Sequence, residues 1–149
     1  MTASAHAIIG AAIVTKIPDL RISLPLVLLS HILADIPEHW DTGCNWQNKG
    51  MKKVFWDSVL DLIVGYSLIA LIFIWGLKAD PVMTYLGAFV GQLPDFLEFP
   101  YFFLHWKFAP WTWINDMAHL FHKKLPQINL GILSQIIICS LFILLAAIK

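Results

Sequence analysis

The feature that most constrains the fold is the apolar run at residues 54–77, which carries no charged side chain after Asp61. An α-helix needs about 20 predominantly apolar residues to cross the ~30 Å hydrocarbon core of a bilayer. The run is long enough for this, and the turn sequence Lys78-Ala79-Asp80-Pro81 follows it directly. The sequence therefore predicts a membrane-spanning helix here.

Composition agrees with a membrane location. Of the 149 residues 58% are hydrophobic and 13% are charged, whereas soluble domains carry about 25% charged residues. Too little charge is left to cover a surface that faces water, and the seven Trp residues suit a membrane interface. We expect a single integral membrane domain at residues 1–149. The ten acidic and ten basic residues cancel, so no basic field is present to attract nucleic acid.

Other apolar segments predict further helices. They span residues 3–15, 20–36, 82–95 and 127–147. The first is too short to cross a bilayer alone, and Gly91, Pro94 and Pro100 interrupt the apolar stretch that begins at residue 82. Residues 105–126 mix Trp, Phe, His and Lys, which is typical of a segment lying at the membrane interface. The expected fold is all-α: a polytopic membrane bundle of about four long helices, a short N-terminal helix and an interfacial segment.

Alternating helix directions would sort the basic residues onto two sides of the membrane. The side that holds the loop at residues 37–53 would carry Lys49, Lys52, Lys53, Lys107, Lys123 and Lys124. The opposite side would carry Lys16, Arg21, Lys78 and Lys149. By the positive-inside rule, the side with more lysines is expected to be cytoplasmic.

The stretch SHILADIPEHWD at residues 30–41 ends an otherwise apolar segment with ionisable side chains. His31 and Asp35 are spaced i, i+4 and share one face of a helix, and His39 follows four residues later, beyond Pro37. Imidazole and carboxylate groups at this spacing, in apolar surroundings, suit zinc or another divalent metal. The alternative is a hydrogen-bonded polar pair that closes the end of the helix.

The expected topology brings more ionisable groups to the same end of the bundle. His6 starts the first helix, Asp57 and Asp61 lie in the first turns of the helix at 54–77, and Asp95 ends the helix at 82–95. A charge at membrane depth costs about 2.5 kcal/mol or more, and two aspartates one turn apart repel each other unless a cation lies between them. We therefore expect a metal site. Its expected ligands are His6, His31, Asp35, His39, Asp57, Asp61 and Asp95.

Several of these residues also have a purely structural interpretation. His6 suits a hydrogen-bonded core histidine, Asp57 a helix-start acid favoured by the helix dipole, and Asp95 a turn acid. His119 and His122, spaced i, i+3, suit contact with lipid headgroups as well as a ligand or catalytic role. The sequence contains no GxSxG, P-loop, HExxH or paired CxxC motif, so serine hydrolases, nucleotide-loop proteins and HExxH proteases have no support.

Four short motifs, AHAIIGAA, SHILADIPEHWD, GQLPD and HLFHKK, follow one another along the chain. Together they resemble the small prokaryotic family of membrane-bound metal-dependent hydrolases. More distantly, HxxxD followed by another His is similar to the zinc-dependent phospholipase C and single-strand nuclease superfamily. There, His and Asp residues on a helical scaffold hold zinc ions that activate water against a phosphoester. The resemblance implies an integral protein of the prokaryotic cytoplasmic membrane.

The leading hypothesis is a membrane-embedded hydrolase with zinc as cofactor, acting on a lipid or lipid-linked phosphoester at headgroup depth. Asp61 or His39 is expected to act as general base, and His119 or His122 to position an anionic headgroup. A second hypothesis is a small ion-binding or transport protein, although the apolar residues 68–76 disfavour a polar path through the membrane. A third is a structural membrane protein with a polar network between its helices.

Overall fold

The computed structural model of the chain describes residues 1–119 and 127–148. Within these residues every element of regular structure is a helix, which confirms the all-α prediction. The elements are α1 (Ala3–Lys16), α2 (Leu20–Ala34), α3 (Trp46–Lys49), α4 (Met51–Ile69), the π-helical η1 (Ala70–Gly76), α5 (Pro81–Gly91), α6 (Leu93–Phe103), α7 (Trp111–His119) and α8 (Ile128–Ala147).

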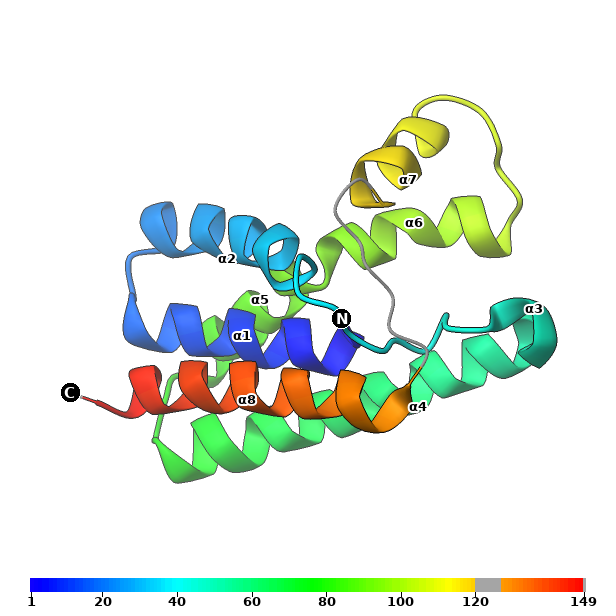
Figure 1. Cartoon of the computed structure of the whole chain (residues 1–149). Helices are drawn as coiled ribbons and strands as arrows, with labels where there is room; N and C mark the ends of the chain where they lie inside the picture. Colours follow the sequence, from blue (N-terminus) through cyan, green and yellow to red (C-terminus); the bar gives the residue numbers. More distant parts are fainter. Residues whose placement is uncertain (120–126, 149) are drawn as a thin grey trace.

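Helix α1 is the central helix of the bundle and contacts α2, α4, α5 and α8 (Figure 1). Its Ala, Ile and Gly residues make it apolar on all sides, and a helix of this kind is stable only when it is buried. Ala7, Ile9 and Ala11 are almost inaccessible to solvent. The side chain of Thr2 caps the helix by accepting a hydrogen bond from the Ala5 N–H. The hydrophobic core is therefore built around α1.

Glycines bring the backbones of α1 and α5 into direct contact. A Cβ atom on Gly10 would lie 2.2 Å from the carbonyl oxygen of Gly87, and one on Gly91 would lie 2.6 Å from the carbonyl oxygen of His6. Small residues four apart, as at Gly87 and Gly91, let helices approach closely in apolar surroundings. This packing holds His6 beside the end of α5.

Among the described residues, two segments are long and apolar enough to cross a membrane: the continuous helix Met51–Gly76, formed by α4 and η1, and α8. In each, only 17% of the most apolar stretch is buried inside the protein, whereas a core helix of a soluble protein would be mostly buried. The helices α1, α2 and α5 are apolar but shorter. Two helices, and not about four, reach spanning length, so the polytopic bundle stays a prediction.

The expected helix boundaries differ from the observed ones mainly after residue 90. The helix predicted at 82–95 ends at Gly91, and a new helix, α6, begins after Gln92. Pro94 lies in the first turn of α6, where its missing N–H has no intrahelical partner to lose. Helices α6 and α7 pack against each other beyond the end of α5 (Figure 1).

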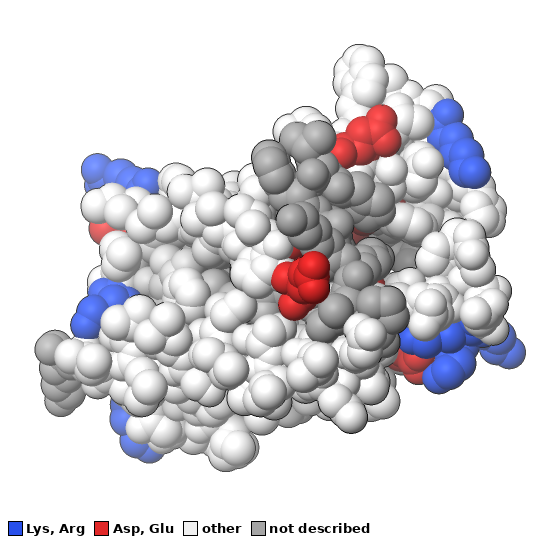
Figure 2. Space-filling view, viewed as in Figure 1, with Lys and Arg blue, Asp and Glu red and all other residues white. Residues whose placement is uncertain are grey.

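Basic side chains gather at two ends of the molecule, and the face between them is mostly uncharged apart from acidic side chains near its centre (Figure 2). Lys16 ends α1 and Arg21 begins α2 at one end of the bundle, while Lys49 and Lys53 belong to α3 and α4 at the other. This is the distribution expected if both ends face water. Lys123, Lys124 and Lys149 lie outside the described residues.

Candidate metal centre

Histidines and aspartates meet where α1 begins, α2 ends and α5 gives way to α6. The members of this cluster are His6, His31, Asp35, His39 and Asp95. The Asp35 carboxylate lies 3.2 Å from Nε2 of His6 and 3.6 Å from Nε2 of His31. It also lies 3.5 Å from Nε2 of His39. Asp95 Oδ1 approaches His31 Nε2 to 3.7 Å.

Backbone carbonyls orient two of the three imidazoles. Nδ1 of His31 lies 2.8 Å from the Gly91 carbonyl oxygen, and Nδ1 of His39 lies 2.8 Å from that of Pro37. Because a carbonyl oxygen can only accept, each Nδ1 carries a proton, and Nε2 of the neutral ring presents a lone pair. Histidine ligands of metals are oriented in the same way, by a hydrogen bond at the other ring nitrogen.

The lone pair on His31 Nε2 faces the carboxylate oxygens of Asp35 and Asp95. Two acceptors attract each other only through a cation, which is either a proton on the ring or a metal ion. His6 stacks on His31 with ring centroids 3.8 Å apart and planes inclined by 21°, so protonating both rings would stack two positive charges. A single metal ion shared by these side chains avoids that repulsion.

His6 supplies a second indication of a ligand. Neither of its buried ring nitrogens has a hydrogen-bond partner among the described residues; Nε2 is within ion-pair distance of Asp35 but is not aligned for a hydrogen bond. Buried imidazole nitrogens are normally satisfied. One ligand atom each from His6, His31 and Asp95 lies within 4.8 Å of the others, so this group can hold a metal ion.

Asp35 is held in its ionised form. Its side chain is buried and contacts the N-terminal ammonium of Met1, which also lies 2.9 Å from His39 Nε2. Burial alone would raise the pKa of Asp35, but His6 and the ammonium group outweigh that effect and hold the pKa well below its usual range. The carboxylate is therefore in the state that metal coordination requires.

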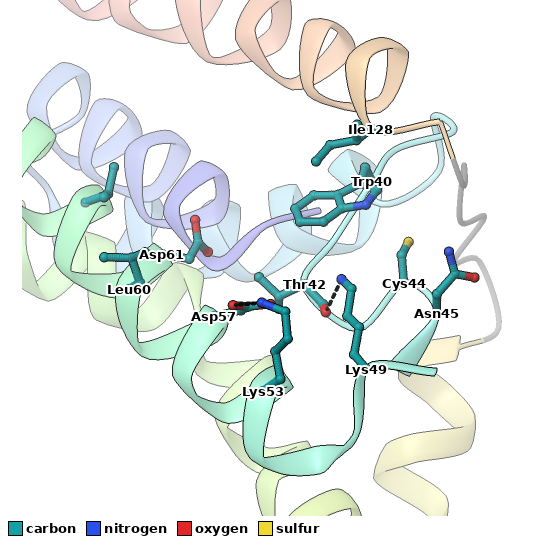
Figure 3. A pocket seen from close by; sticks show the side chains of 11 residues that line it. Trp40, Thr42, Cys44, Asn45, Lys49, Lys53, Asp57, Leu60, Asp61 and Ile128 are labelled. Atoms are coloured by element: carbon teal, nitrogen blue, oxygen red, sulfur yellow. Dashed lines mark hydrogen bonds and ion pairs between the residues drawn. The ribbon is translucent and has the colours of Figure 1, made fainter. Parts of the chain in front are cut away.

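Asp61 binds the start of α1 and lies outside the histidine cluster. Its carboxylate accepts hydrogen bonds from the Ser4 N–H at 3.0 Å and from the Ser4 hydroxyl at 2.5 Å. The first N–H groups of a helix have no partner within it and carry partial positive charge, so a carboxylate there is stabilising. Asp57 pairs instead with Lys53 at 2.9 Å (Figure 3).

Two glutamines that our sequence interpretation left out of the site hold its surroundings together. Gln135 accepts from the Thr2 N–H at 2.8 Å and donates to the Trp40 carbonyl at 2.7 Å. Gln92 donates to the Ala3 carbonyl at 2.8 Å. Both are buried amides inside apolar segments, and a polar group in such a segment is the signal that could have identified them.

The late histidine pair adds little to the described site. His119 ends α7, where only its backbone is described, and His122 lies outside the described residues. The expected roles of these two histidines stay predictions.

Comparison of the chain with protein-family models, curated proteins and solved structures gives no match. The candidate metal centre therefore rests on its own geometry. The family resemblance of the four sequence motifs stays a prediction.

Proposed function

We propose that the chain is a membrane-embedded, metal-dependent hydrolase whose ion is held by His6, His31, Asp35 and Asp95. The observation that carries the proposal is the buried Nε2 of His31, which faces Asp35 at 3.6 Å and Asp95 at 3.7 Å. Imidazole and carboxylate donors are the ligand types of catalytic zinc, which keeps a coordination position open. A bound zinc ion supplies an activated water and a Lewis acid.

His39 is the better candidate for the general base. Its Nε2 lies 3.5 Å from Asp35, and its Nδ1 proton is committed to the Pro37 carbonyl. Asp61, the other residue expected in this role, has both carboxylate oxygens engaged by Ser4. A general base must lie within reach of the water that it deprotonates, and His39, beside the proposed ligand Asp35, meets this requirement better than Asp61 does. In this proposal the substrate is a lipid or lipid-linked phosphoester.

The exposed apolar surface supports the membrane location and the polytopic bundle. Along α4, η1 and α8 large apolar side chains point outward, including Trp75 and Ile137, which are 67% and 63% exposed. Soluble monomers rarely expose contiguous apolar patches larger than a few hundred Å². The shorter helices α1, α2 and α5 would complete the bundle inside the bilayer.

Metal analysis tests the proposal directly. The wild-type protein and the His31→Ala variant are purified in detergent with metal-free buffers, and bound metal is measured by elemental analysis. We expect near-stoichiometric zinc in the wild type and loss of most of it in the variant, because His31 lies between both carboxylates. His105→Ala, which changes a histidine outside the cluster, is the matched control and should keep its metal.

Two outcomes would overturn the metal site. Equal metal in wild type and His31→Ala would mean that the ligands lie elsewhere. No metal in the wild type, together with a melting temperature that a chelator leaves unchanged, would favour a structural network of hydrogen bonds. Hydrolysis of a model phosphodiester that requires added zinc, and that is lost in His39→Ala with metal retained, would support the enzymatic part.

A further inference from the structure

We propose that the pocket between α4 and the start of α8 binds an anionic phospholipid, with the phosphate at one end and an acyl chain at the other. The pocket is open to the surface and has a volume of about 520 Å³. The residues that line it include Trp40, Lys49, Lys53, Leu60 and Ile128 (Figure 3), together with Val64. The inference rests on the membrane location proposed above and is independent of the metal centre.

The polar end of the pocket presents two ammonium groups. Lys49 Nζ lies 5.0 Å from the centroid of the Trp40 ring and donates to the Thr42 carbonyl at 3.3 Å. Lys53 Nζ lies 2.9 Å from Asp57 Oδ1 (Figure 3). A lysine ammonium is a strong point-charge partner for phosphate, and Trp beside Lys is typical of the headgroup region.

The other end of the pocket is apolar. Leu60 and Val64 lie one turn apart on α4, further from the lysines along the helix, while Ile128, the first residue of α8, lies beside Trp40 (Figure 3). These three side chains are 61%, 46% and 48% exposed. They belong to the two helices that are long enough to span a membrane. The order from lysines to apolar residues therefore matches the order from headgroup to acyl chain in a lipid.

The polar end of the pocket carries two lysines against one aspartate. Lys49 ends α3 and Lys53 lies in the first turn of α4, and Asp57 is the acidic group that pairs with Lys53. Asp61 also lines the pocket, but its charge is engaged by the positive start of α1. A phosphate would compete with Asp57 for Lys53, so Asp57 should limit the affinity of the pocket for the phospholipid.

The test measures the melting temperature of the full chain in detergent, with added phosphatidylglycerol or phosphatidylcholine. We expect phosphatidylglycerol to raise the melting temperature of the wild type more than phosphatidylcholine does. Each lysine near a lipid headgroup contributes about fivefold in affinity. Lys49→Ala and Lys53→Ala should therefore each need about fivefold more phosphatidylglycerol for the same shift.

Two further variants separate a specific pocket from general charge attraction. Lys52→Ala removes the same charge from the same turn, but at a residue that does not line the pocket, and should leave the response almost unchanged. Asp57→Asn frees Lys53 and should strengthen the response. An equal loss in Lys52→Ala and Lys53→Ala, or no difference between the two lipids, would overturn the proposal.

Metal analysis of the same samples keeps the two proposals apart. Lys53→Ala should retain the metal of the wild type, and His31→Ala should retain the response to phosphatidylglycerol. In the wild type, bound metal without a lipid preference contradicts the lipid site alone, while a lipid preference without bound metal contradicts the metal centre alone.

Discussion

At the residue scale, the group that lies opposite a carboxylate across the helix interface determines the role of that carboxylate. Asp35 meets imidazoles from α1, α2 and the following loop, whereas Asp61 meets the N–H and hydroxyl of Ser4. The sequence spacing predicted correctly that His31 and Asp35 share a face. It could not separate Asp61 from the cluster, because i, i+4 spacing defines a helix face and not the group that lies opposite.

Asp61→Asn should destabilise the protein without releasing metal. Hydrogen bonds to charged groups contribute about 1.5–3 kcal/mol each, so the free energy of unfolding should fall by about that amount while metal content stays at the wild-type level. Thermal or denaturant unfolding and elemental analysis measure the two quantities. Ser4→Ala combined with Asp61→Asn should be less than additive, because both remove the same hydrogen bond. Metal loss with unchanged stability would instead make Asp61 a ligand.

At the element scale, local sequence signals predicted where helices end. They did not predict which helices contact each other. Pro18 and Pro37 follow the ends of α1 and α2, as their chemistry predicts. The π-helical η1, closed by the hydrogen bond from the Leu77 N–H to the Ile72 carbonyl at 3.0 Å, contains no proline and has no such signal. Nor did the sequence alone pair Gly10 with Gly87, since small residues fit many interfaces.

Gly10→Ala should weaken the bundle by forcing α1 and α5 apart. The new Cβ would lie 2.2 Å from the Gly87 carbonyl oxygen, and overpacking of this kind costs about 1–3 kcal/mol. Gly76→Ala is the matched control, because its Cβ would meet only the Leu71 carbonyl oxygen at 3.4 Å. Chemical denaturation in detergent compares the two variants. Similar stability losses would show that the contact is not as close as described.

At the scale of the whole molecule, composition predicted an apolar protein with few charges, and the structure exposes large apolar side chains along both long helices and along α2. The number of spans could not be predicted in the same way. Length distinguishes a helix that can span a membrane from one that is too short. The helices α1, α2 and α5 are short and apolar, and their position in the bundle depends on how they pack against the other helices. That packing involves backbone contacts and buried amides, which the spacing of apolar residues in the sequence does not predict.

The substitution Ile137→Arg tests whether α8 faces lipid or water, because the two surroundings predict different effects on the amount of folded protein. Ile137 is 63% exposed near the middle of the helix. In a bilayer an arginine at this depth costs about 2.5–3.5 kcal/mol, so we expect less protein in carbonate-washed membranes than for the wild type. On a surface that faces water, the same change would leave the amount of folded protein unchanged or raise it. A gain of folded protein in the soluble fraction would contradict the membrane location.

The glycine contact between α1 and α5 has a consequence for ion selectivity. His6 lies on α1, the carbonyl that orients His31 belongs to Gly91 on α5, and Asp95 follows in α6. Because α1 and α5 touch through their backbones, the backbone of His6 and the carbonyl that orients His31 are held at a fixed separation, which narrows the range of spacings that the ligand atoms can adopt. Divalent ions differ in radius and preferred coordination. A set of ligands with such restricted spacing would discriminate among divalent ions by size. Bound ions would exchange slowly, because the helix bundle must open first.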